Sequence, residues 1–542
     1  MPAMKQKRMA NRSSGHASSP AAMPAQSTAV YVSAGFSPGS LPDRRSLANT
    51  FLFRHAMGLA VASGLMIVML PVVVLAGGFE IGDQGARAAG RGGAFAARAD
   101  DLSAVEYNPA GLARLRGTRF FLGNRFTYAS EEFHRAATLD WSEAVHGMPR
   151  YVEFEAVRND NPWQLLNPMA LISSDFGLQD WTFALGTYAP SGIASQQFPK
   201  DGPQRYMLTR REVQILYYDL SVAWKYKDIV GVGLSLQWVD VPLLKFDLAV
   251  DGSLSPGLVY PAENPYELRA QIEGADHIGF SGILGAWYRP VPFLEVALSG
   301  RFIPVKVKAD ATLHVEPVTL DLDEPIELSR NGSSADDVRF TMTLPAYARF
   351  GLRYIFSRQD VEWFDIELDL TYEASSMVKS YNLNGDGLIA EVLGQQIAID
   401  KISIPKHWQD TFSVRLGSDV TVVPEWLSLR VGGFYESPAS KPEYSYVDFF
   451  SGHRFGVGAG FSFTAGGFDL SASYSYLFQL PVVVNEADAR VYQQIPGSPC
   501  QSPYSDTAVC DSHYLGQPGP SVNAGTYISD YHFTSVSVRY AF

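Results

Sequence analysis

Along most of the chain, apolar and polar residues alternate one by one over segments of about 9–11 residues. In Phe364–Tyr372, apolar residues alternate with Asp365, Glu367, Asp369 and Thr371. The segments Leu216–Tyr226, Phe455–Phe463 and Phe468–Phe478 follow the same pattern. A period of two places successive side chains on opposite faces of a β-strand. Residues from about 118 to 542 are therefore predicted to form one all-β unit.

These segments have the length that a tilted strand needs to cross a bilayer, and aromatic residues lie near their ends. The second face carries small or charged residues, which suits the lumen of a barrel. Short turns alternate with long polar stretches, as in outer-membrane barrels with tight periplasmic turns and long external loops. An even number of strands suits a closed barrel, and we expect fourteen, beginning near residues 118, 168, 180, 211, 229, 279, 293, 340, 361, 410, 426, 453, 467 and 530.

The last residues carry a further signal. Val536, Val538, Tyr540 and Phe542 share one face of the predicted final strand. A final Phe with an aromatic residue two positions earlier is similar to the assembly signal of bacterial outer-membrane proteins; an ordinary edge strand is the alternative. We therefore expect a multi-pass β-barrel in the bacterial outer membrane, with outer-membrane lipid and the barrel-assembly machinery as partners.

The N-terminal part has a different composition. No charged residue occurs from Ala56 to Phe79, and Val74-Leu75-Ala76 forms a small-residue cleavage pattern. This pattern predicts a signal peptide at 51–76; an uncleaved membrane anchor is the alternative, which Pro71 disfavours. Residues 1–50 are rich in Ser, Ala and Pro and are interpreted as a disordered extension or as the result of a start codon assigned too far upstream.

Residues 77–117 are rich in Gly and Ala and too few to bury a core of their own. Asn108 precedes Pro109, which pushes Asn108 out of the helical region and lets it cap a short helix over Pro109–Arg114. We expect this segment to form a small helical hatch that plugs the lumen of the barrel at 118–542.

Three motifs in the hatch region are familiar: Gly90-Arg91-Gly92-Gly93-Ala94, Ala99-Asp100-Asp101 and Asn108-Pro109-Ala110-Gly111-Leu112. They resemble the hatch of the FadL/TodX (OmpP1) family, outer-membrane transporters of long-chain fatty acids and hydrocarbons. The resemblance covers about residues 77–542. It implies an all-β membrane protein, with a fourteen-stranded antiparallel barrel closed by an N-terminal hatch.

The resemblance also implies roles for individual residues. Asn108, Pro109 and Ala110 match the gating motif, and Phe79 and Ile81 fall where family members face a lumenal ligand pocket. Pro190, Ser191 and Gly192 match the kink in the third strand, Trp181–Tyr188, through which ligands leave sideways. Pro removes a ladder donor and Gly permits unusual dihedrals, which agrees with a kink. An ordinary transition from strand to loop is the alternative.

A groove between external loops is the family's first binding place. The apolar loop residues that could form it are Leu254, Leu258, Tyr260, Leu313, Val315 and Leu320; packing between loops is the alternative. The fifth strand shows no clear basic counterpart for a fatty-acid carboxylate, so the possible contacts are Lys245, Arg301 and Arg349. These arginines could equally pair with Asp365, Glu367 and Asp369, which leaves carboxylates and neutral hydrocarbons open as substrates.

Other chemistry is weakly supported. The net charge is 43 − 56 = −13 and no long basic tract occurs, which argues against a nucleic-acid partner. Two cysteines cannot build a zinc cluster, and the ten His residues form no ligand pair, so neither a metal nor a cofactor is expected. Cys500 and Cys510 share one external loop, either as a disulfide or as two free thiols. His532 and Ser535 lie on opposite strand faces, so an enzyme is not expected.

The function predicted from the sequence is a transport channel for hydrophobic molecules, foremost long-chain fatty acids. Transport would be ligand-gated passive diffusion with release through a third-strand gap, by a monomer. The alternatives are a transporter of neutral aromatic or alkane hydrocarbons and a loop-based surface receptor or adhesin.

Overall fold

The structure is a computed structural model, which describes residues 83–145, 148–190, 192, 194–251, 264, 267–318, 326–359, 361–392, 395–493 and 521–542. All of these residues fall in one compact unit. The predicted signal peptide and the segment before it lie outside the described residues. So do nine residues named above: Phe79, Ile81, Ser191, Leu254, Leu258, Tyr260, Leu320, Cys500 and Cys510.

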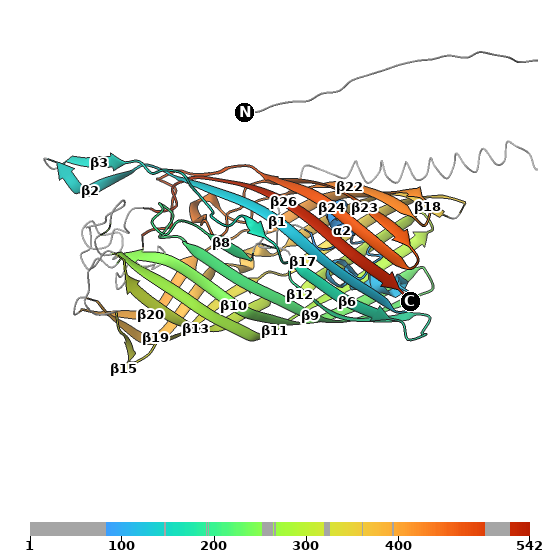
Figure 1. The fold of residues 1–542 in the computed structure, drawn as a ribbon, viewed down its shortest axis with the longest axis horizontal. Helices are drawn as coiled ribbons and strands as arrows, with labels where there is room; N and C mark the ends of the chain where they lie inside the picture. The colour runs from blue at the N-terminus through green and yellow to red at the C-terminus, as the bar shows by residue number, and fades with distance from the viewer. Residues whose placement is uncertain are drawn as a thin grey trace, which may run out of the picture. The chain divides into compact units, whose positions relative to one another are not determined.

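One antiparallel sheet closes into a barrel of fourteen spans, which confirms the predicted architecture (Figure 1). In chain order the spans are β1 (Arg119–Arg135), β6 (Pro168–Ser174), β7 (Trp181–Tyr188), β9 (Arg210–Tyr226), β10 (Val230–Asp251), β11 (Glu267–Val291), β12 with β13 (Leu294–Ile303, Val305–Pro317), β16 with β17 (Asp337–Leu344, Tyr347–Arg358), β18 with β19 (Val361–Glu373, Ser380–Val392), β20 with β21 (Gln395–Pro405, Thr411–Val423), β22 (Leu427–Glu436), β23 (Arg454–Ala465), β24 (Phe468–Gln479) and β26 (Gly525–Ala541).

Pairing between the first and last spans closes the barrel. β1 and β26 stay in register from Arg119↔Ala541 to Arg135↔Gly525 without a shift. This closure joins the first strand of the sheet to the last, as a barrel in lipid requires. Six short strands also belong to this sheet: β4 (Val157–Arg158), β5 (Trp163–Gln164), β8 (Ser195–Gln197), β14 (Leu328–Arg330), β15 (Ser333–Ser334) and β25 (Val482–Val484). A separate hairpin is formed by β2 (Thr138–Val145) and β3 (Met148–Val152).

The predicted alternation sorts side chains as expected. On β24, Asp469, Ser471, Ser473 and Ser475 are buried inside the barrel. The outward face carries exposed apolar residues around the wall, among them Leu122, Leu220, Leu284, Leu298, Leu429, Val457 and Leu470. An apolar outer face and a polar inner face invert the arrangement of a soluble barrel, as contact with lipid demands.

The N-terminal segment lies inside the barrel. It contains α2 (Ala86–Gly90), α3 (Ala104–Tyr107) and the 3₁₀ helix η1 (Pro109–Arg114), and nearly all its residues are buried. Figure 1 shows α2 within the wall, toward the end where β26 finishes, and the β2–β3 hairpin at the opposite end. Two further 3₁₀ turns, η2 (Ser375–Met377) and η3 (Pro442–Tyr444), lie in connections between strands. No helix in the described part of the chain is long and apolar enough to span a membrane.

Three of the long polar stretches that the sequence predicts as loops, about 247–277, 309–338 and 373–409, are largely strands where the structure describes them, so the prediction was wrong there. β10 continues to Asp251, β13 runs to Pro317, and β19 and β20 occupy most of 380–405. The wall extends beyond the apolar belt, where Lys306 and Lys308 face outward into water. The charged residues on the outer face of these strands gave the stretches the polar composition that is typical of loops.

Candidate transport site

Asn108 joins two parts of the hatch to the wall. Its backbone is extended, at φ −162° and ψ 96°, as the following proline predicts. The side chain accepts a hydrogen bond from the N–H of Ala110 at 3.2 Å and thereby caps η1. Its amide nitrogen donates to the carbonyls of Ala96 at 2.8 Å and of Ala286, on β11, at 3.2 Å. A side chain that is both donor and acceptor is needed here, which explains the choice of Asn.

Two paired glycines make room for this motif. Gly233 on β10 and Gly285 on β11 face each other in register. A Cβ atom at Gly285 would overlap Asn108 Oδ1, and one at Gly233 would overlap the backbone of Pro109 and Ala110. Beside them, the indole N–H of Trp287 donates to the carbonyl of Ala110 at 2.9 Å. The wall is therefore shaped to receive the Asn-Pro-Ala segment.

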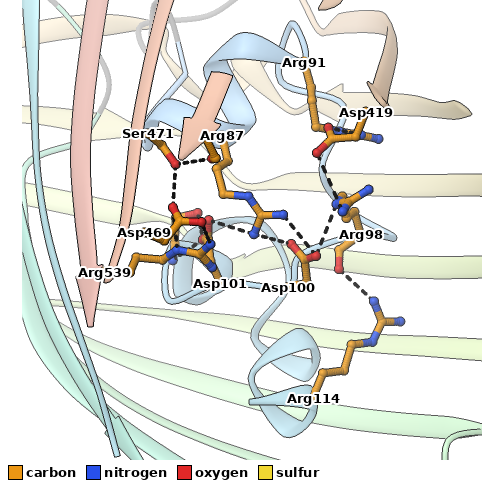
Figure 2. A network of polar contacts seen from close by, with 12 residues as sticks. Arg87, Arg91, Arg98, Asp100, Asp101, Arg114, Asp419, Asp469, Ser471 and Arg539 are labelled. Carbon is orange, nitrogen blue, oxygen red and sulfur yellow. Dashed lines mark hydrogen bonds and ion pairs between the residues drawn. The ribbon is translucent and has the colours of Figure 1, made fainter. Parts of the chain in front are cut away.

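Buried arginines hold the rest of the hatch, as Figure 2 shows in part. Arg91 is fully buried and forms ion pairs with Asp365 at 2.8 Å, Glu367 at 2.9 Å and Asp419 at 2.6 Å. Arg98 forms ion pairs with Glu362 and Asp365, both at 2.8 Å. Each guanidinium is surrounded by carboxylates from the wall, which offsets the cost of burying it.

The carboxylate row on β18 also binds the hatch backbone. Asp369 accepts the N–H groups of Phe95 and Ala96, each at 2.8 Å, and Glu367 accepts that of Ala97 at 2.6 Å. These carboxylates were predicted as possible partners of lumenal arginines. Arg353 does pair with Asp365, as well as with Glu295 and Glu362. The hatch arginines were not predicted as partners, although their spacing in a Gly-rich segment was a signal.

The third span is interrupted after Tyr188. Its ladder with β6 ends at Met169↔Tyr188, with one further backbone hydrogen bond from the N–H of Ala189 to the carbonyl of Pro168 at 3.1 Å. On its other side the ladder with β9 stops at Tyr188↔Tyr217 and resumes at Ser195↔Glu212, so six residues of the third span oppose four of β9. Pro190 and Gly192 fall within this excess, where the sequence predicted a kink. The outward residues beside it, Leu165 and Leu166, are 60% and 82% exposed.

Side chains replace the missing ladder. Asn167 donates to the carbonyl of Pro190 at 3.2 Å. Gln84, the second described residue of the hatch, donates to the carbonyl of Ala189 at 2.8 Å and to the side chain of Asn167. The hydroxyl of Tyr107 donates to the carbonyl of Gln84 at 3.0 Å. Gln84 thus connects the hatch directly to the interruption.

Part of the inner face in the outer half of the barrel is apolar. On β13 every inward residue is buried and without a polar group: Val305, Val307, Ala309, Ala311, Leu313 and Val315. Phe246 of β10 stacks on Phe340 of β16 with ring centroids 5.0 Å apart, although β11 and β13 separate these strands in the sheet. The lumen is therefore polar beside the hatch and has an apolar side farther out, formed by β10, β13 and β16.

Residues 437–453, which join β22 to β23, cross the outer mouth. The carbonyl of Asp448 accepts from Arg211 of β9 at 2.9 Å, and that of Val447 from Gln196 of β8 at 3.3 Å. β9 is the fourth span and β22 the eleventh, so these contacts join opposite sides of the wall. Lys406, just after β20, contacts both carboxylate oxygens of Asp448 at 2.6 and 2.7 Å.

A family model described as outer membrane protein transport protein (OMPP1/FadL/TodX) matches residues 67–510. The chain belongs to the FadL/TodX family. A search of curated proteins found no match.

Solved structures of FadL/TodX proteins share the fold. A FadL homologue from Pseudomonas aeruginosa superposes with a TM-score of 0.64 at 15% identity, covering 86% of this chain and 100% of that one. The toluene transporter TodX of Pseudomonas putida gives 0.55 at 14%, with 85% and 98% covered. The toluene transporter TbuX of Ralstonia pickettii gives 0.53 at 15%, with 86% and 100% covered. At these identities the likeness extends to the fold alone.

As a FadL/TodX protein, the chain is an outer-membrane channel for hydrophobic compounds and not an enzyme. This membership favours the channel over the receptor or adhesin interpretation. No cluster of His, Cys, Asp and Glu that could hold a metal ion occurs among the described residues.

The three basic residues predicted to meet a carboxylate lie in different surroundings in this FadL/TodX barrel. Lys245 faces outward and pairs with Glu273 at 2.8 Å, which does not suit the predicted contact with a carboxylate inside the barrel. A β-bulge shifts the register between Val239 and Leu244 and reverses the faces beyond it. Arg301 and Arg349 do face inward, where Arg301 contacts the hydroxyl of Tyr217 and Arg349 donates to the carbonyl of Glu106 in the hatch.

The predicted loop groove changes as well. Leu313 and Val315 lie on β13 and face the barrel interior, so assigning them to an external loop was wrong. Both residues form part of the apolar inner wall of this FadL/TodX barrel.

Proposed function

We propose that this FadL/TodX channel carries long-chain fatty acids passively from the outer mouth to the hatch and releases them sideways at the third-span interruption. The observation that carries the lateral route is the ladder between β6 and β7, which ends at Met169↔Tyr188 beside the hatch. Unpaired backbone groups facing lipid are costly, so irregular backbone at membrane depth occurs where it lines a cavity.

The apolar inner wall supports a hydrophobic substrate. The inward residues of β13, with Phe246 and Phe340, present hydrocarbon where a porin presents polar groups to water. Transfer of a long acyl chain from water to such a surface is favourable, by about 0.8 kcal/mol for each methylene group that is buried. The wall thus favours compounds with extended apolar surface.

The hatch supplies the gate in this proposal. Gln84 contacts both Ala189 and Asn167 across the interruption, whereas Asn108 and the arginine cluster hold the rest of the hatch against the wall. A ligand that displaced the start of the hatch would break the Gln84 contacts and leave the remainder in place. Movement of a few residues would then open the route without expelling the plug.

Neutral aromatic hydrocarbons are the second candidate class of substrate. Two of the superposed structures are toluene transporters, and the apolar wall suits such molecules equally well. The two classes differ in charge, because a fatty acid carries a negatively charged carboxylate and an aromatic hydrocarbon does not. A channel can distinguish them by this charge.

Gly192→Val tests the lateral route. A branched side chain at the interruption is expected to narrow it and to slow uptake of labelled oleate about tenfold, which corresponds to about 1.4 kcal/mol in the barrier. The assay uses a Gram-negative host that lacks its own fatty-acid channel, with toluene as a second probe. Gly433→Val is the matched control, because Gly433 lies on the unbroken β22 and its nearest neighbour would be 3.1 Å from the new Cβ.

Oleate uptake by Gly192→Val at the wild-type rate would disprove the lateral route. Uptake of toluene without oleate in the wild type would replace fatty acids by the second class. Surface expression of both variants is checked by the heat-dependent gel mobility of the folded barrel.

A further inference from the structure

Arg125 lies on the inner face of β1 at membrane depth. Its guanidinium is almost completely buried, with 1% of the residue exposed. The neighbouring outward residues, Leu122 and Phe126, are 64% and 37% exposed and contribute to the apolar belt. A cation at this depth is expensive and calls for a partner.

Arg125 has few contacts within the described part of the chain. Nη2 donates to the carbonyl of Gly192 at 3.3 Å, and the ring of Phe533 lies 5.3 Å from the guanidinium carbon. Nε and Nη1 have no hydrogen-bond partner, and among the described residues no carboxylate forms an ion pair with it. An arginine cannot shed its proton to relieve this situation.

Other buried arginines at the hatch are compensated differently. Arg91 contacts three carboxylates, and Arg353 contacts Glu295, Glu362 and Asp365. Around these two arginines the wall places carboxylates that offset the cost of burying a charge. Arg125 has no such carboxylate, and two of its three guanidinium nitrogens lack an acceptor.

The place of Arg125 connects it to the interruption. The carbonyl it contacts belongs to Gly192, within the irregular part of the third span. Its own backbone N–H donates to the carbonyl of Asn167 at 3.2 Å, and the Asn167 side chain donates to Pro190 at 3.2 Å. Any molecule leaving between these segments would pass the free donors of Arg125.

We infer that Arg125 binds the anionic head of the substrate, so that the channel selects long-chain carboxylates over neutral hydrocarbons. This inference rests on the proposed function and specifies its substrate class. A carboxylate supplies the acceptors that Nε and Nη1 lack, and hydrogen bonds between two charged groups are about twice as strong as neutral ones. The acyl chain would occupy the apolar lumen while its head lies at the exit.

The experiment compares oleate with oleyl alcohol, which has the same chain and a neutral head. Equilibrium binding of each tritiated probe is measured on the purified full-length barrel in nanodiscs. The Arg125→Gln variant is expected to bind oleate about tenfold more weakly or worse, because the charge-assisted bonds are lost. Oleyl alcohol is expected to bind within about twofold of the wild type, because only the ionic contact has changed.

Arg135→Gln is the matched control. Arg135 lies on the same strand and the same face, about 33 Å farther along β1 at 3.3 Å per residue. Its guanidinium likewise contacts carbonyls, those of Pro203 at 3.3 Å and Ser521 at 3.5 Å. Removing this charge is expected to leave the binding of both probes unchanged, which separates a local contact from the overall charge of the lumen.

Arg125→Lys keeps the charge and is expected to retain oleate binding better than Arg125→Gln. If the Gln variant does not fold, the test is the ratio of oleate to oleyl alcohol binding in Arg125→Lys compared with the wild type. Oleate binding that survives Arg125→Gln, or that falls equally with Arg135→Gln, would overturn the inference. Binding of oleyl alcohol but not oleate by the wild type would overturn it while leaving a neutral-compound channel. A folded wild type that binds neither probe would overturn the proposed function as well.

Discussion

Single residues explain how the hatch motif is seated. Asn108 bridges Ala96, Ala110 and the wall carbonyl of Ala286, and the absence of side chains at Gly233 and Gly285 allows this approach. The Asn-Pro-Ala motif is therefore half of a joint, and the paired glycines on β10 and β11 are the other half.

Gly285→Ala tests this joint. The new methyl group would overlap Asn108 Oδ1, and overpacking of this kind typically costs about 1–3 kcal/mol. We expect the hatch to be displaced and ion leakage through the barrel in planar bilayers to rise. Gly433→Ala, at an outward position of β22, serves as the control and should keep the wild-type conductance. Unchanged conductance in Gly285→Ala would show that the joint does not seal the lumen.

At the scale of elements, β18 and the segment 437–453 have complementary tasks. The inward carboxylates of β18 anchor the hatch at one level of the lumen. The crossing segment reaches β8 and β9 above it. The apolar inner wall lies between two closures, so both a hatch movement and a rearrangement of the crossing segment bear on passage.

Lys406→Met tests the crossing segment. Removing one partner of a buried ion pair leaves Asp448 uncompensated, at a cost of about 3–5 kcal/mol. We expect segment 437–453 to leave the mouth, and limited proteolysis of intact cells to cut there while the barrel stays folded. The double variant Lys406→Met with Asp448→Leu removes both charges and should regain part of the protection. Resistance of the single variant to protease would indicate that other contacts hold the segment.

At the scale of the whole molecule, the wall is a closed barrel with an internal hatch of about thirty residues in the described part of the chain. The hatch is joined to the wall by ion pairs and backbone hydrogen bonds on several strands. Transport in such a molecule is expected to follow the gradient of the substrate.

Proteoliposomes test this expectation directly. Purified barrel in vesicles without any energy source should equilibrate labelled oleate in both directions, with initial influx and efflux rates that agree within about twofold at equal gradients. Vesicles without protein give the background rate of membrane permeation. Accumulation above the external concentration, or flux that needs an added energy source, would rule out passive transport.

Alternation of residues alone determined most of the fold. It predicted fourteen spans and the face of each regular strand, because side chains on a strand have a strict period of two and lipid accepts only one kind of face. The third-strand kink was expected from the resemblance to the FadL/TodX family, with which Pro190 and Gly192 agree. The hatch and its Asn-Pro-Ala segment were also recognisable, since Asn before Pro has few backbone choices. These features depend on neighbours along the chain.

Tertiary structure decided what depends on neighbours across the barrel. A bulge in β10 reversed the face of Lys245, and one shifted register changes every side chain beyond it. The pairing of Arg91 with β18, the reach of residues 437–453 to β9 and the unmatched donors of Arg125 bring together positions far apart in the chain. Alternation tells which side of the wall a residue faces, but only closure of the barrel determines what it meets there.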